Sequence, residues 1–170
     1  MTFLIHFKAL LLYLIFSECV FGVPLDFDQQ KRIKWGLLKP KTSIPFQDCG
    51  SEFDIVELNI SSCTELPCQM PRGTPVNVST MFNDFGKSPN LLKHRVRWDI
   101  QSVKTDARVT PDPCFEKNEC FYEEIEGTVS LATVFVNSNL PLFIGTMDWE
   151  VMDDSDERVM CYKVPIVITP

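Results

Sequence analysis

Apolar and polar residues alternate through most of the chain that follows residue 50. Val56, Leu58 and Ile60 are separated by single polar residues, and the same period of two recurs further along. Such alternation predicts strands that are buried on one face and exposed on the other. The predicted strands cover residues 56–60, 76–82, 96–100, 128–136, 142–151 and 159–169.

The predicted strands are separated by turn-forming stretches. Residues 83–90 (NDFGKSPN) are rich in turn formers, and residues 153–157 (DDSDE) form an acidic turn. Residues 103–114 are polar and contain Pro111 and Pro113, so the pattern predicts no strand there. Regularly spaced strands without a long helix predict an all-β fold, an immunoglobulin-like sandwich of two antiparallel sheets.

Residues 1–22 differ from the rest of the chain. Lys8 precedes an unbroken apolar run, residues 9–16 (ALLLYLIF), and Gly22 offers a small residue for cleavage. This is the pattern of a secretory signal peptide. A transmembrane anchor is the alternative, but the apolar run is shorter than the about 20 residues that cross a bilayer.

Residues 23–45 form a locally basic extension before the predicted domain, residues 46–170. Lys31, Arg32 and Lys34 are basic, and Ile33 and Trp35 add apolar surface. We expect a flexible extension that is partly docked on the domain. A membrane-touching amphipathic segment and a pro-segment cut near Lys31 and Arg32 are the alternatives.

The cysteines indicate an oxidising compartment. Of the seven, Cys19 lies in the predicted signal peptide, which leaves an even number. An even number in a secreted chain predicts disulfides rather than zinc, and no CxxC pair is present. Spacing predicts three bridges: Cys63–Cys68, Cys114–Cys120 and, by elimination, Cys49–Cys161.

Two sequons for N-glycosylation lie in predicted strands. Asn59 begins Asn-Ile-Ser and Asn77 begins Asn-Val-Ser. Both asparagines occupy the polar phase of their strands, so we expect both on an exposed face.

The charge and the chemical groups favour a non-enzymatic protein. The net charge is −7, which disfavours nucleic acid as a partner. His94 lies between Lys93 and Arg95, and we expect it on the surface. No G-x-S-x-G elbow or phosphate-binding glycine loop occurs. We therefore predict no catalytic residue, no metal and no cofactor.

The apolar phase of the strands predicts which side chains point between the sheets. Periodicity does not distinguish a packed core, which is the commoner outcome, from the lining of a cavity. The inward residues are Ile60, Val76, Val78, Phe82, Val96, Trp98, Val134, Val136, Met147, Trp149, Tyr162, Val164 and Ile166.

Several short motifs, spread over about residues 46–170, resemble the ML-domain lipid-recognition family. Residues 46–51 (FQDCGS) resemble the start of the mature domain, and residues 149–166 (WEVMDDSDERVMCYKVPI) resemble its end. The six-residue step from Cys114 to Cys120 and the two sequons also match. The resemblance implies the same three disulfides and an immunoglobulin-like sandwich with an apolar cavity between its sheets.

The resemblance also implies a lipid site. It places Val136, Leu140 and Pro141 at the mouth. The nine residues expected to line the interior are Ile60, Val76, Val78, Val96, Met147, Trp149, Tyr162, Val164 and Ile166. Residues 104–108 (KTDAR) are charged where sterol-binding members carry an apolar segment. The implied ligand therefore remains open among cholesterol, another sterol, a fatty acid and a phospholipid.

We expect a secreted, monomeric lipid carrier that works extracellularly or in the lysosomal lumen. Its partner is a sterol or similar lipid, together with a membrane surface or a membrane lipid-transfer protein. One alternative is an immune module that binds microbial lipid. Another is a secreted interaction protein with a packed core.

Overall fold

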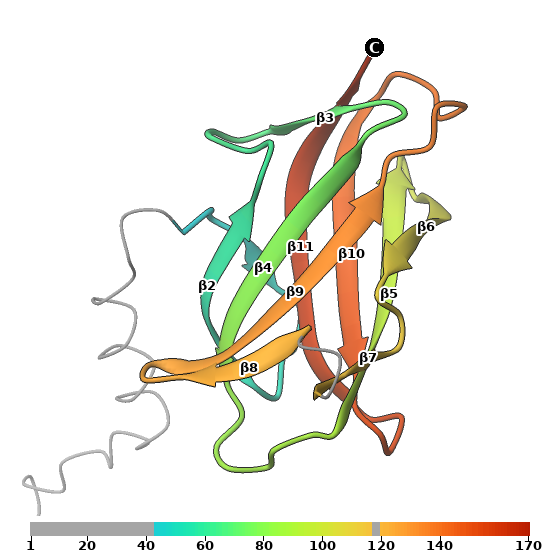
Figure 1. Ribbon diagram of the computed structural model, residues 1–170. Coiled ribbons are helices and arrows are strands. Elements are labelled where there is room, and N and C mark those ends of the chain that lie inside the picture. Colours follow the sequence, from blue (N-terminus) through green and yellow to red (C-terminus); the bar gives the residue numbers. More distant parts are fainter. Residues whose placement is uncertain (1–42, 117–119) are drawn as a thin grey trace, which may run out of the picture. The chain divides into compact units, whose positions relative to one another are not determined.

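The computed structural model describes residues 43–116 and 120–170, and this part of the chain is all β-structure (Figure 1). The predicted signal peptide and most of the predicted extension lie outside the described residues. The strands are β1 (Gln47–Asp48), β2 (Asp54–Ile60), β3 (Cys68–Pro71), β4 (Pro75–Asn83), β5 (Leu91–Ile100), β6 (Val103–Thr110), β7 (Cys114–Phe115), β8 (Phe121–Glu124), β9 (Gly127–Phe135), β10 (Ile144–Met152) and β11 (Arg158–Thr169).

The strands form one curled sheet that folds into two layers. Their order is β1-β11-β10-β5-β6-β9-β4-β2, with β3, β7 and β8 pairing beside this path. Apart from the parallel pairing of β3 with β11, every pairing is antiparallel. In Figure 1 the ribbons of β4 and β9 cross in front of β10 and β11. We call β5, β10 and β11 the β10 layer, and β2, β4 and β9 the β4 layer. This is the predicted sandwich.

Strand β6 connects the two layers, and the hydrophobic pattern missed it. Its first half pairs with β5, as in Val96 with Ala107, and its second half pairs with β9, as in Val109 with Val134. The strand lies at the surface, and only Ala107 and Val109 pack partly against the core. An exposed connecting strand needs no apolar alternation, which is why residues 103–110 did not show one.

A β-bulge changes the inward phase of β2. The register shifts between Ile55, opposite Phe82, and Glu57, opposite Met81. Ile55, like Leu58 and Ile60, is buried, whereas Val56 is only half-buried. The prediction that Val56 shares the inward phase of Leu58 and Ile60 was therefore wrong, because a bulge inserts one residue and reverses the faces before it.

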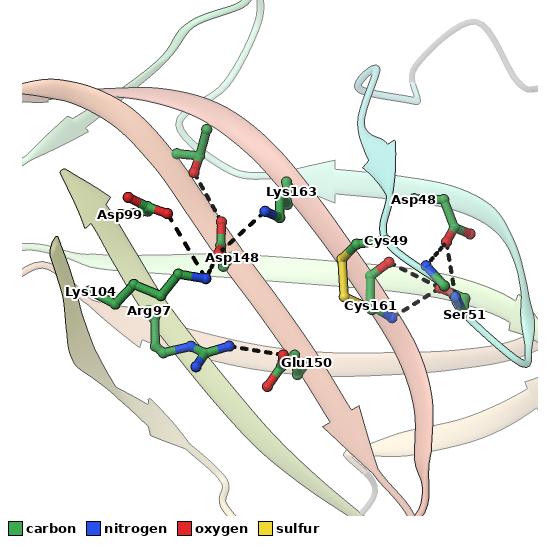
Figure 2. Close-up of a disulfide and its surroundings, with 12 residues drawn as sticks. Asp48, Cys49, Ser51, Arg97, Asp99, Lys104, Asp148, Glu150, Cys161 and Lys163 are labelled. Carbon is green, nitrogen blue, oxygen red and sulfur yellow. Dashed lines mark hydrogen bonds and ion pairs between the residues drawn. A yellow bond between two sulfur atoms is a disulfide. The ribbon is translucent and has the colours of Figure 1, made fainter. Parts of the chain in front are cut away.

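The chain segment 46–51 locks β1 onto β11 (Figure 2). The Asp48 carboxylate accepts hydrogen bonds from the N–H groups of Gly50 and Ser51, at 2.7 and 2.9 Å. Gly50 has φ +103°, a conformation that glycine adopts without strain. The Ser51 hydroxyl donates to the Cys161 carbonyl and accepts from the Cys161 N–H, at 3.1 and 2.9 Å. The Cys49–Cys161 disulfide reinforces this junction.

All three disulfides have the predicted pairing. Cys49–Cys161 spans 112 positions, whereas Cys63–Cys68 and Cys114–Cys120 span 5 and 6. The long bridge restricts the unfolded chain most, because the entropy that a crosslink removes grows with the loop that it closes.

We predict that Cys49→Ser with Cys161→Ser lowers the free energy of unfolding by about 4–5 kcal/mol, and Cys63→Ser with Cys68→Ser by about 2 kcal/mol. Chemical denaturation of the purified proteins measures both. Equal losses from the two double variants would contradict loop length as the cause.

Candidate functional site

The residues predicted to line a lipid site lie mainly on the two facing inner surfaces. Eleven of the twelve are buried, and Pro141 is exposed. The β10 layer contributes Val96, Met147, Trp149, Tyr162, Val164 and Ile166, and the β4 layer contributes Ile60, Val76 and Val78. Val136 and Leu140, which follow β9, are buried as well. Strand register brings several of these residues side by side, as in Trp149 opposite both Val96 and Tyr162.

A hydrogen bond joins the layers across the interior. The Tyr162 hydroxyl of β11 lies 3.1 Å from the Thr80 hydroxyl of β4, and both residues are buried. The Tyr162 ring also stacks on Trp149, with ring centroids 5.9 Å apart, and meets Phe46 edge-on. Burial raises the pKa of Tyr162, so the phenol stays protonated. At this level side chains from both layers are in contact.

His94 is buried, and the prediction of a surface histidine was wrong. Only 8% of the residue is exposed. Its neighbours Lys93 and Arg95 are charged because they lie on the opposite face of β5, whereas position 94 has the inward phase of Val96. The Trp149 indole N–H donates to His94 Nδ1 at 3.1 Å, and the two rings meet edge-on. Burial lowers the pKa of His94 to about 4, although the nearby Asp112 acts to raise it.

The outer face of the β10 layer carries a charged cluster (Figure 2). Asp148 Oδ2 lies 2.8 Å from Lys104 Nζ and 3.7 Å from Lys163 Nζ, and Thr146 donates to Oδ1 at 2.9 Å. Burial acts to raise the pKa of Asp148, but these hydrogen bonds and charges outweigh it and lower the pKa. Lys104 belongs to the charged segment 104–108, and its ammonium group is directed at Asp148 (Figure 2).

The two sequon asparagines lie on the outer face of the β4 layer. Asn59 pairs in register with Ser79, and Asn77 with Thr133. Asn59 is half-buried and Asn77 is exposed. Together with Leu131 they line a surface pocket of about 580 Å³. The polar phase of both strands therefore lies where it was predicted.

The described residues were also compared with the requirements of a metal site and of a membrane-spanning helix. Within residues 43–116 and 120–170, no three His, Cys, Asp or Glu side chains lie close enough together to hold a metal ion. No helix in this part of the chain has the length and apolar character needed to cross a membrane.

These features define an immunoglobulin-like β-sandwich with three disulfides and two apolar inner faces. The chain belongs to the ML domain family, whose sequence model matches residues 43–168. The matched region includes Ile44, which is buried and whose N–H donates to the Leu58 carbonyl at 2.8 Å.

Individual relatives are similar at modest identity. The NPC intracellular cholesterol transporter 2 of Mus musculus is 26% identical over 128 residues, 73% of this chain and 84% of that protein. The Drosophila melanogaster protein named NPC intracellular cholesterol transporter 2 homolog a is 24% identical over 131 residues, 74% of this chain and 88% of its own length. A crystal structure of a Niemann-Pick type C2 protein from Japanese carpenter ant matches with a TM-score of 0.61 and 22% identity, over 74% of this chain and 100% of that one. This last likeness supports the fold.

We predict that Tyr162→Phe lowers the free energy of unfolding by about 1–3 kcal/mol, because it leaves the buried Thr80 hydroxyl without its partner. Adding Thr80→Val should recover much of the loss, since it removes the unpaired hydroxyl. Urea denaturation of the two single variants and the double variant measures the coupling. Additive losses would show that the contact contributes nothing.

We predict that the protein loses stability as the pH falls from 6.5 to 4. In this window the unfolded chain binds a proton at His94 that the folded chain does not, so the free energy of unfolding decreases by roughly 3 kcal/mol. Below about pH 4 both states are protonated and this contribution no longer changes. Denaturation of the wild type and of His94→Gln at several pH values isolates the effect, because the carboxylates titrate in both. Parallel pH profiles would contradict it.

Proposed function

We propose that the protein is a carrier that holds a sterol or a similar apolar lipid between its two layers and releases it without covalent chemistry. The supporting observation is the pair of facing inner surfaces, whose buried side chains are apolar over most of β4, β10 and β11. Burial of lipid surface contributes about 25 cal/mol per Å², which offsets removal of the lipid from a membrane. The relatives named as cholesterol transporters support the same function.

A carrier that takes up a lipid by burying it needs an opening that a lipid can reach from the membrane. Pro141 is exposed, and Leu142 and Ile144, which follow it, have exposed fractions of 55% and 75%. We propose that this apolar segment is the mouth and contacts the membrane or a membrane lipid-transfer protein, while Leu140 packs beneath it. The carrier then acts as a monomer and not as an enzyme.

We also propose that the carrier works outside the cytosol, in the extracellular space or the lysosomal lumen. Three disulfides persist best in an oxidising compartment. Glycans at Asn59 and Asn77 would project from the outer face of the β4 layer, away from the interior, and leave a lipid between the layers undisturbed.

One observation favours the rival function of a secreted interaction protein with a packed core. The Thr80–Tyr162 hydrogen bond and the stacking of Tyr162 on Trp149 show that part of the interior is filled by side chains. A lipid must therefore lie beside this contact or displace it. Whether the secreted protein contains or takes up lipid decides between the carrier and the interaction protein.

We predict that Val164→Phe reduces lipid uptake strongly, while Val167→Phe leaves it near the wild-type value. Both positions lie on β11, but Val164 is fully buried on the inner face and Val167 is half-buried on the outer face. A larger inner side chain removes space for ligand, at a cost of about 1–3 kcal/mol in stability.

Native mass spectrometry of the secreted protein, followed by competition with a fluorescent sterol, measures uptake. A bound lipid that sterol displaces supports the carrier function. A protein that emerges without lipid and takes up neither sterol nor fatty acid has a packed core, and the interaction function then replaces the carrier function.

A further inference from the structure

The two sequons lie side by side on neighbouring strands. Asn59 of β2 pairs in register with Ser79 of β4, and Ser61, two residues after Asn59, lies opposite Asn77. The Ser61 N–H donates to the Asn77 carbonyl at 2.9 Å, and the Asn77 N–H donates to the Ser61 hydroxyl at 3.1 Å. The asparagine of each sequon is therefore opposite the serine of the other, on the outer face of the β4 layer.

Asn77 occupies the middle of this face, whereas Asn59 belongs to β2, the last strand in the sheet order. On its other side Asn77 pairs with Thr133 of β9, which pairs in turn with Thr110 of β6. The Thr133 hydroxyl donates to Asn77 Oδ1 at 2.9 Å. This bond holds the amide oxygen toward β9 and leaves Nδ2, the atom to which an N-glycan is attached, out of the contact.

The surface pocket of about 580 Å³ lies around Asn77. Amides and hydroxyls predominate among its side chains, and the apolar ones include Leu131 and Pro111. A pyranose ring has polar groups around its edge and C–H groups on its faces, so it suits a surface of this mixed kind. The side chains on the outward phase of the strands are Asn59, Ser61, Asn77, Ser79, Leu131 and Thr133, and Thr110, Pro111 and Cys120 line the pocket beside them.

Leu131 is an exposed leucine in a polar row. It is 39% exposed, and Ser79 is its neighbour in register. Because Asn77 pairs with Thr133, two residues along β9, Leu131 is a diagonal neighbour of Asn77. Diagonal neighbours on one face of an antiparallel pair are about 7–8 Å apart. A single exposed leucine is common, but this one lies within reach of a sugar ring attached to the Asn77 amide.

We infer that this pocket seats the first N-acetylglucosamine of a glycan on Asn77, with a C–H face of the sugar on Leu131 and its polar groups beside Ser79 and Thr110. The rest of the glycan projects from the outer face. Contact with the sugar removes Leu131 from water, which stabilises the folded domain. Because the sugar is covalently attached, the pocket needs little affinity for free sugar.

This inference rests on the proposed passage through the secretory pathway, where N-glycans are attached, and not on lipid carriage. The attachment transfers an oligosaccharide from a lipid-linked diphosphate donor. The bond from C1 of the sugar to Asn77 Nδ2 forms, the bond from C1 to the diphosphate oxygen breaks, and Nδ2 loses one proton. No oxidant or reductant is needed.

Stepwise trimming tests the seat. Asn59→Gln, secreted by cells that keep glycans in the high-mannose form, carries a glycan at Asn77 alone. An endoglycosidase then leaves one sugar on the asparagine. Adding Ser79→Ala removes the sequon but keeps Asn77, and Ser79→Thr is the matched control that keeps the sequon. In urea denaturation the full and one-sugar forms should agree, as should Ser79→Thr. The form without sugar should have an unfolding equilibrium constant roughly threefold to tenfold higher.

Leu131 provides a direct readout. In the one-sugar form with ¹³C-labelled leucine methyl groups, protons of the sugar should show nuclear Overhauser contacts with Leu131. Leu142, which is 55% exposed and does not line the pocket, should show none. Leu131→Ser should raise the unfolding equilibrium constant of the one-sugar form more than that of the Ser79→Ala form, because only the first has a sugar to lose contact with.

The outcomes separate the seat from the proposed compartment and from lipid carriage. If Asn77 of the secreted protein carries no sugar, the inference falls, while lipid uptake is unaffected. If the sugar is present but shows no contact with Leu131, and its loss leaves stability unchanged, the glycan projects freely and the seat is absent, although the compartment stands. Should Leu131→Ser or Ser79→Ala fail to be secreted, the contacts of the sugar in the one-sugar form still decide.

Discussion

The hydrogen bond between Tyr162 and Thr80 is the contact on which the relation of the two layers depends. Each layer has an apolar inner face, and apolar packing alone is non-directional. A buried phenol and a buried hydroxyl must find partners, and here each satisfies the other across the interior. The pair therefore specifies which part of β11 faces which part of β4. Side chains fill the interior at that level, so any lipid has to lie beside this contact or displace it.

The aromatic residues extend this contact across the β10 layer. Tyr162 stacks on Trp149, and Trp149 donates its indole N–H to His94. The three side chains come from β11, β10 and β5, which are neighbours in the sheet. Polar groups therefore continue from Tyr162 in the middle of the sandwich as far as His94 on β5. Most buried side chains of the interior are apolar, and the polar groups of Tyr162, Trp149 and His94 lie on three neighbouring strands.

The outer surfaces of the two layers are built differently. On the β10 layer, Asp148 is held by Lys104 and Lys163, and Arg97 pairs with Glu150 at 2.8 Å (Figure 2). On the β4 layer, the polar phase carries the two sequons. Paired charges lie on one layer and predicted glycans on the other. The segment after Leu140 is an exposed apolar stretch, and the proposed mouth lies there.

The sequence by itself determined the fold class, the six longest strands apart from β6, the disulfide pairing and nearly all of the interior. Period-two patterns and cysteine spacing are local signals, and burial of Met147, Trp149, Tyr162 and Val164 follows from them. Only the tertiary structure decided the bulge in β2, the passage of β6 between the layers and the hydrogen bond that His94 accepts. A bulge reverses which side chains of a strand point inward, and the amino-acid composition does not signal it. A connecting strand lies at the surface and shows no alternation. The hydrogen bond to His94 comes from Trp149, a residue 55 positions away that β-pairing brings alongside it.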